Sequence, residues 1–157
     1  MWIVMIKASL GNQELLTLPK VAFLCSRRIP AATVLKCYDW AIARRDEGQC
    51  VISGFHSQME KDVLYYLLKG TQPIILALAR GMKSRLEPEL KPHLDEGRLL
   101  IITPFDTTVK RVTAETSRMR NLMMLELADE ILIGYSSPGG QLEEILNSYK
   151  GKSVYWL

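Results

Sequence analysis

Three short segments of the chain carry groups that are suited to holding an anion. Residues 26–28 (Ser-Arg-Arg) and 53–54 (Ser-Gly) each follow an apolar or β-branched run, and residues 118–121 (Arg-Met-Arg-Asn) stand near the start of an apolar helical stretch. A guanidinium binds phosphate through a planar fork of donors. Backbone amides at strand ends and helix starts add further donors. The three segments together indicate a phosphate-binding site.

A fourth segment, Ser136–Gly140, adds to this set. Its two glycines allow a ligand to approach the backbone closely, and Ser137 followed by Pro138 predicts the N-cap and first residue of a helix. The candidate phosphate-binding residues are therefore Ser26, Arg27, Arg28, Ser53, Gly54, Arg118, Arg120, Asn121, Ser137, Gly139 and Gly140.

Each of these segments also has a plainer interpretation. Two arginines after a strand are often solvated surface charges, and Ser-Gly or Pro-Gly-Gly is common turn chemistry. The phosphate interpretation rests on convergence, because the carboxyl ends of successive parallel strands line one crevice. Arginine-rich segments from different parts of the chain would meet there.

Other kinds of chemistry find less support. No G-x-G-x-x-G occurs, which disfavours a dinucleotide cofactor, and no metal-ligand spacing is present, so we expect neither a cofactor nor a metal. His56 and Glu60 are spaced i,i+4, which suits an acid–base pair but is more typical of a surface pair. Cys25 is interpreted as a small buried hydrophobe.

The elements that would position these residues alternate along the chain. The sequence predicts strands at residues 20–25, 50–52, 73–78, 99–102, 130–134 and 153–157. It predicts helices at about residues 30–47, 59–69, 88–96, 112–128 and 138–149. This alternation favours an α/β fold, a single-domain, doubly wound, mostly parallel Rossmann-like sheet with three α/β/α layers. We expect this domain to span residues 20–157.

Residues 1–19 fit the pattern least well. Gly11-Asn12 is a turn signal, so we interpret the apolar run from Trp2 to Lys7 as an edge strand or a dimer contact. That run is too short to cross a membrane, and we expect no membrane partner.

Composition sets limits on the class of protein. With 157 residues, 48% hydrophobic content and a net charge of +3, the chain resembles one soluble domain without a strong overall basic bias. Its three cysteines are odd in number and lack paired spacing, which favours reduced thiols and a cytoplasmic location.

The order of these motifs resembles the Rossmann core of the DNA-processing protein A (DprA/Smf) family. That family has a strand followed by G-S-R, a later S-G-L-A-x-G-I-D and an R-N-R at a helix start. Here the chain has Cys25-Ser26-Arg27, then Ser53-Gly54-Phe55, then Arg120-Asn121-Leu122. Cys25 stands where the family has glycine, and Leu122 where it has a second arginine.

The resemblance implies binding of single-stranded DNA by a homodimer, with Arg27, Arg120 and Asn121 in contact with the DNA. More broadly, the chain resembles the superfamily that also holds the lysine-decarboxylase-like LOG proteins. Those enzymes use P-G-G-x-G-T-x-x-E to hold a nucleotide and cleave its N-glycosidic bond, and here Pro138-Gly139-Gly140 matches the opening.

Three hypotheses follow for the function. The first is a basic crevice that binds single-stranded DNA without catalysis. The second is a LOG-like nucleotide-binding protein or a nucleoside-monophosphate N-glycosidase, in which Glu143 or Glu144 would supply the acid. The third is a nucleotide-sensing or scaffolding module.

Overall fold

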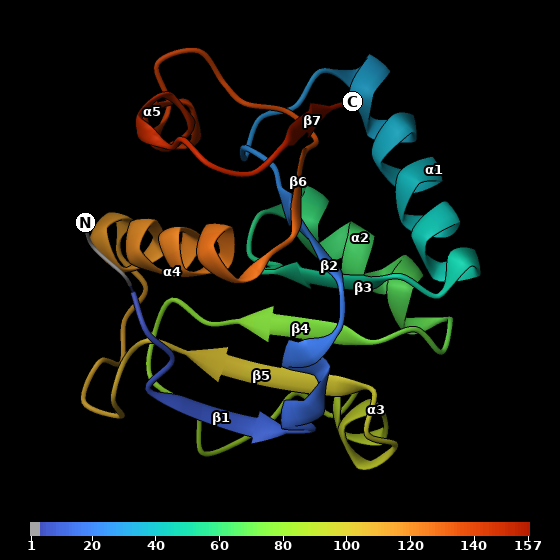
Figure 1. Cartoon of the computed structure of the whole chain (residues 1–157), viewed down its shortest axis with the longest axis vertical. Coiled ribbons are helices and arrows are strands. Elements are labelled where there is room, and N and C mark those ends of the chain that lie inside the picture. Colours follow the sequence, from blue (N-terminus) through green and yellow to red (C-terminus); the bar gives the residue numbers. More distant parts are fainter. Residues whose placement is uncertain (1–3) are drawn as a thin grey trace.

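One strongly twisted sheet organises the molecule, as the computed structural model of residues 4–157 shows (Figure 1). Its seven strands, all within the described residues, run in the order β1-β5-β4-β3-β2-β6-β7. Only β1 is antiparallel, and it pairs with β5 at one edge. The strands are β1 (Ala8–Gly11), β2 (Lys20–Leu24), β3 (Cys50–Ser53), β4 (Ile74–Ala77), β5 (Leu99–Thr103), β6 (Glu130–Ile133) and β7 (Val154–Trp156).

Helices cover both faces of this sheet. They are the short 3-10 helix η1 (Gln13–Thr17), then α1 (Ala31–Glu47), α2 (Gln58–Leu68), α3 (Lys91–Asp95), α4 (Ala114–Leu127) and α5 (Gln141–Ser148). The sequence prediction of a doubly wound, mostly parallel α/β fold in three layers is confirmed.

The buried strands explain why continuous apolar runs predicted them. In β2, Val21 and Phe23 pack with Cys37 of α1 and other residues on one face. Ala22 and Leu24 pack with residues of α4 and α5 on the other face. Because both faces are covered, every position must be apolar and the alternation typical of half-exposed strands disappears.

Three local predictions differ from the structure. The N-terminal edge strand is Ala8–Gly11 rather than the apolar run from Trp2 to Lys7, of which Trp2 and Ile3 lie outside the described residues. Apolarity does not locate an edge strand, because one side of such a strand faces solvent. The helix predicted from Pro88 is only α3, and α5 begins at Gln141 with Gly140 as its N-cap rather than Ser137.

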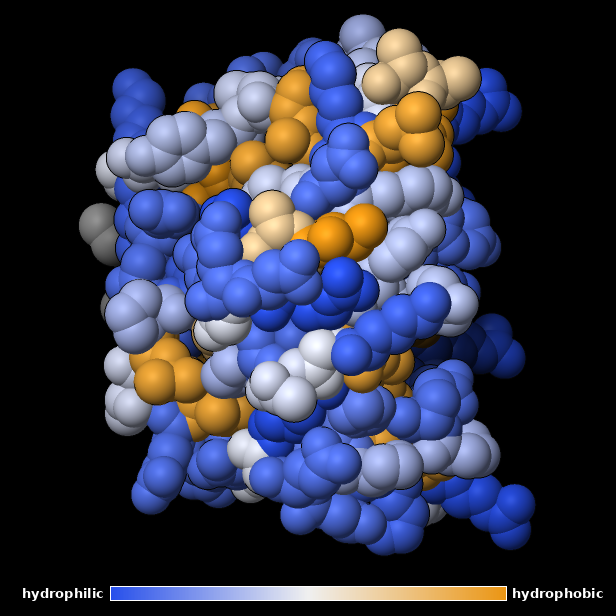
Figure 2. Space-filling view, turned by 90° about the vertical axis from the view of Figure 1, so that its right-hand side faces the viewer, coloured by the Kyte–Doolittle hydropathy of each residue, from blue (hydrophilic) through white to orange (hydrophobic). Residues whose placement is uncertain are grey.

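The face of the molecule on which α1 lies carries only small apolar areas. Figure 2 shows the side on which α1 lies in Figure 1, and there hydrophobic side chains form small groups separated by hydrophilic ones. Within residues 4–157, no helix combines the length and the apolar character that crossing a bilayer demands.

Candidate anion-binding site at the strand ends

A crevice of about 640 Å³ opens at the carboxyl ends of β2 and β3, beside the segment that follows β6. β2 lies between β3 and β6, so the chain leaves β2 toward one edge of the sheet and later crosses to the other. Such a switch point leaves a gap in which ligands of open α/β sheets bind. The residues that line the crevice include Ser26, Arg27, His56, Glu60, Thr113, Ser117, Arg120, Asn121, Ser137, Gly140 and Gln141.

A hydrogen bond joins the two sides of the switch point. The backbone N–H of Ser137 donates to Oγ of Ser26 at 2.9 Å, and the N–H of Ser26 donates to the carbonyl of Tyr135 at 2.8 Å. These contacts hold the loop after β2 against the loop after β6. The hydroxyl hydrogen of Ser26 stays available to a ligand, because its oxygen acts as the acceptor.

Two arginines from distant parts of the chain line this crevice. Arg27 is exposed, whereas Arg120 is only 5% exposed. In the described residues, no carboxylate oxygen lies within 4.0 Å of either guanidinium. Both arginines also lower the pKa of His56, after the larger effect of its own burial. Glu60, which also lines the crevice, acts on this pKa in the opposite direction, but the pKa is lowered on balance.

Arg120 is held by few contacts. Its Nε donates to Oδ1 of Asn121 at 2.8 Å, and one terminal nitrogen donates to the carbonyl of Ala77 at 3.1 Å. A Cβ at position 54 would collide with the guanidinium, so Gly54 makes room for Arg120. The second and third predicted segments thus meet, although Gly54 lies beside the neighbouring apolar cavity rather than in the crevice.

Glu60 occupies backbone amides after β2 and at the start of α2, which a bound anion would otherwise meet. Its Oε1 accepts from the N–H groups of His56 (2.9 Å) and Ser57 (3.2 Å), and its Oε2 accepts from Cys25 (3.1 Å). Ser53 is fully buried and its Oγ accepts from the N–H of Phe55, so its hydroxyl does not line the crevice. A ligand would depend on side chains more than on amides.

The interpretation of His56 and Glu60 as a surface pair is wrong. Glu60 is 8% exposed, and it contacts His56 through the backbone N–H of that residue. The missed signal was Ser57-x-x-Glu60, a capping box that starts α2 and draws the carboxylate inward. The polar residues Thr113, Ser117 and Gln141 were also missed; they line the crevice from the first turns of α4 and α5.

Besides Ser53 and Gly54, five further predicted residues do not line the crevice. Arg28 is exposed and Arg118 is half-buried on α4, well inside the helix rather than at its start. Gly139 is exposed, with a φ of 73°, and its N–H donates to Oε1 of Glu143 at 3.2 Å. Glu143 lines a separate hollow beside Trp156, and Glu144 is exposed, so neither carboxylate reaches the crevice.

The remaining reactive groups fit structural roles. Cys25 is 5% exposed, as its interpretation as a small hydrophobe requires. A hydrogen bond with Cys37, together with burial, holds the pKa of Cys25 far above the ordinary range. Between residues 4 and 157, no group of three or more His, Cys, Asp or Glu is placed to hold a metal ion.

Comparison with known proteins rests on structure alone. No family model matches the chain, and no curated protein matches it in sequence. DNA processing protein A (DprA) from Streptococcus pneumoniae superimposes with a TM-score of 0.73 at 16% identity, over 94% of this chain and 53% of that chain. DprA from Helicobacter pylori gives a TM-score of 0.61 at 18% identity, over 80% and 58%. The chain has a DprA-like Rossmann fold.

The chain spans a little over half the length of these two DprA chains. The Moco carrier protein from Chlamydomonas reinhardtii is similar too, with a TM-score of 0.55 at 10% identity, over 89% of this chain and 78% of that chain. The fold of this chain is therefore similar both to DprA and to a protein with a different name. Fold alone does not choose between the ligands.

Proposed function

We propose that this protein binds single-stranded DNA through the crevice between β2 and β6. The observation that carries the proposal is the pair Arg27 and Arg120, which line one crevice without a carboxylate partner in the described residues. An anion would neutralise both guanidiniums, and the planar fork of arginine matches a phosphate. The similarity to H. pylori DprA, whose structure reports a single-stranded DNA binding mode, supports this ligand.

Polar side chains around the two arginines would complete the contacts. Ser26 retains a hydroxyl hydrogen, and Ser117 and Gln141 bring further donors to the crevice from α4 and α5. These groups bind phosphate and sugar without reading bases, so we expect little sequence preference.

The test is the salt dependence of binding to a labelled oligothymidylate, followed by fluorescence anisotropy. For single strands the slope of log K against log salt is about −0.7 per phosphate neutralised. Arg27→Ala should weaken binding and make the slope shallower by about 0.7. Arg85→Ala is the control, because Arg85 is exposed and lines neither the crevice nor the apolar cavity. Unchanged affinity and slope in Arg27→Ala would refute the assignment.

A small nucleotide-like phosphate ligand would use the same two arginines. A thermal-shift screen separates the two ligands, since only a ligand that binds the folded protein stabilises it, and does so more at higher concentration relative to its Kd. If nucleoside monophosphates raise Tm while oligothymidylate does nothing, the protein is a nucleotide-binding module rather than a DNA-binding protein.

The homodimer implied by the resemblance to the DprA family and the cytoplasmic location indicated by the unpaired cysteines belong to this proposal as well. Sedimentation velocity of the full chain, with and without oligothymidylate, tests the dimer. A single species of monomer mass under both conditions would contradict it.

A further inference from the structure

A second hollow lies beside the crevice, on the sheet face that α2 covers only in part. In a doubly wound sheet the crossover from β4 to β5 normally supplies a helix that covers this region. Here the crossover is an irregular segment, residues 78–90, followed by the five-residue α3. The result is an apolar cavity of about 910 Å³, within the size range of small-molecule sites.

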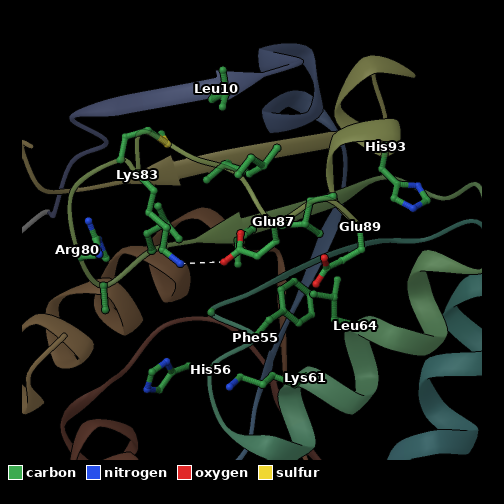
Figure 3. A pocket seen from close by; sticks show the side chains of 18 of the residues that line it. Leu10, Phe55, His56, Lys61, Leu64, Arg80, Lys83, Glu87, Glu89 and His93 are labelled. Carbon is green, nitrogen blue, oxygen red and sulfur yellow. Dashed lines mark hydrogen bonds and ion pairs between the residues drawn. The ribbon is translucent and has the colours of Figure 1, made fainter. Parts of the chain in front are cut away.

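The walls of this cavity are mostly apolar (Figure 3). Phe55 and Leu64 come from the loop after β3 and from α2, Leu78 follows β4, and Leu86 comes from the irregular segment. Water makes few favourable contacts with apolar walls. Binding of an apolar ligand that displaces this water would therefore be favourable.

Cationic side chains outnumber acidic ones around the cavity. Six Lys or Arg residues and two Glu residues line it, and Glu87 is already paired with Lys83 at 2.8 Å. In Figure 3, Lys61 and Arg80 lie on the side away from His93. A ligand that fills the cavity would therefore meet positive charge at one end.

Arg120 marks where a negative group would sit. It lines both the cavity and the crevice, as do His56 and Val112. Burial lowers the pKa of Arg120, since a charge without a close partner is poorly tolerated away from water. Glu60 acts on it only from beyond 4.0 Å.

A second buried arginine, Arg98, has a structural role and can be compared with Arg120. Arg98, 6% exposed, makes hydrogen bonds with Leu67, Leu68, Gln72 and His93 through all three of its nitrogens. Arg120 is equally buried and makes two hydrogen bonds. Its remaining donors are available to a ligand.

We propose that the apolar cavity binds a small amphipathic anion, with its acid group on Arg120 and its apolar body between α2 and residues 78–90. The body is of the size of a medium-length acyl chain or a fused aromatic ring system. This inference does not rest on DNA binding in the crevice, although the two ligands would share Arg120.

Isothermal titration of the full chain with decanoate and with 1-naphthoate tests the proposal and distinguishes the two kinds of body. At about ten times Kd, either ligand should raise Tm by roughly 3–6 °C. Decanol carries the body without the acid, and acetate carries the acid without the body, so each should bind at least tenfold more weakly. Decanol binding as tightly as decanoate, or no binding by either acid, would overturn the proposal.

Variants within the cavity separate this site from the crevice. Leu86→Trp fills the cavity from the irregular segment and should weaken binding of the acid at least tenfold. Leu64→Trp fills the cavity from α2. Because the two substitutions lie in different elements, a loss of binding in both is not explained by a local folding defect in one of them. Arg27→Ala should leave binding of the acid within about twofold while it weakens oligothymidylate. If both tryptophan variants, with unchanged Tm, bind the acid as wild type does, the cavity is not the site.

Discussion

His56 stands between the two candidate sites and reports the charge around them. Its pKa lies below the ordinary value of 6.5, first because of burial and then because of the positive charges of Arg120, Lys61 and Arg27, which outweigh the opposing charge of Glu60. The free protein therefore holds this imidazole neutral near pH 7. A bound anion would favour the protonated form and raise its pKa.

This coupling predicts the pH dependence of oligothymidylate binding. Because the complex takes up a proton that the free protein lacks, affinity should rise as pH falls from about 7.5 to about 5.5, by roughly three- to tenfold. The phosphodiester itself does not titrate in this range. His56→Ala should flatten the profile, whereas His93→Ala, whose ring contacts Arg98 instead, should keep it. A profile that falls toward acid pH in the wild type would contradict the coupling.

Arg120 and Arg98 allow a direct comparison of two buried arginines. Arg120→Met removes an unneutralised charge and two hydrogen bonds, effects of opposite sign, so the free energy of unfolding should change by less than about 1 kcal/mol. Arg98→Met leaves several buried carbonyls without donors and should cost about 3 kcal/mol. Urea denaturation measures both.

Binding should show the reverse order. Arg120→Met should abolish binding of both oligothymidylate and decanoate, while folded Arg98→Met should retain it. A loss of stability in Arg120→Met as large as that in Arg98→Met would assign Arg120 a structural role instead.

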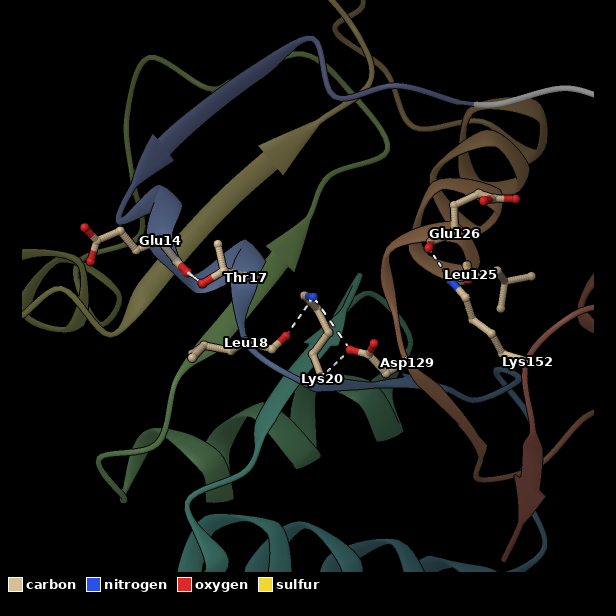
Figure 4. Close-up of polar contacts among 8 residues, drawn as sticks. All are labelled: Glu14, Thr17, Leu18, Lys20, Leu125, Glu126, Asp129 and Lys152. Carbon is tan, nitrogen blue, oxygen red and sulfur yellow. Dashed lines mark hydrogen bonds and ion pairs between the residues drawn. The ribbon is translucent and has the colours of Figure 1, made fainter.

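At the scale of elements, the start of β2 is fixed by a charge pair that joins it to Asp129, between α4 and β6 (Figure 4). Nζ of Lys20, which is 5% exposed, donates to the carbonyl of Leu18 at 2.9 Å and lies 3.8 Å from Oδ2 of Asp129. The N–H of Lys20 donates to the same oxygen at 2.9 Å. This contact sets the register of β2 against β6.

Asp129→Ala should therefore destabilise the fold. It leaves a buried ammonium without its counter-ion and a strand N–H without its acceptor, so the free energy of unfolding should fall by about 1–3 kcal/mol. Asp95→Ala is the matched control, because the Asp95–Lys91 pair is exposed and should contribute less than about 0.5 kcal/mol. Equal urea midpoints for the two variants would show that the pair does not hold β2.

The sequence predicted the elements better than their ends, for a physical reason. Apolar runs predict buried strands such as Leu99–Thr103. The end of the long α1 is predicted by Gly48, which has a φ of 74°. The start of α5 depends on how Ser137 pairs with Ser26 across 111 positions, a contact that no local pattern encodes.

In the candidate site, too, some features could be predicted from the sequence and others could not. Topology correctly brought Arg27, Arg120 and Ser137 to one crevice, because parallel strand ends must meet. It could not foresee that Glu60 would take the amides, or that residues 78–90 would leave a cavity next to Arg120. Both depend on how side chains pack between distant elements.

At the scale of the whole molecule, the crevice and the cavity are neighbours that share part of their lining. His56, Val112 and Arg120 line both, so a ligand in the crevice and a ligand in the cavity would use the same guanidinium. Two ligands that compete for one buried guanidinium must weaken each other, and linkage requires that the factor be the same in both directions.

We therefore expect decanoate and oligothymidylate to bind with negative coupling. Saturating decanoate should weaken the affinity for labelled oligothymidylate by about 5–20-fold, and saturating oligothymidylate should weaken decanoate by the same factor. Anisotropy measures the first and isothermal titration the second. In Leu86→Trp the effect of decanoate on DNA affinity should vanish while DNA affinity itself stays unchanged, because the tryptophan blocks only the cavity. If neither ligand changes the affinity for the other in the wild type, Arg120 binds only one of the two ligands.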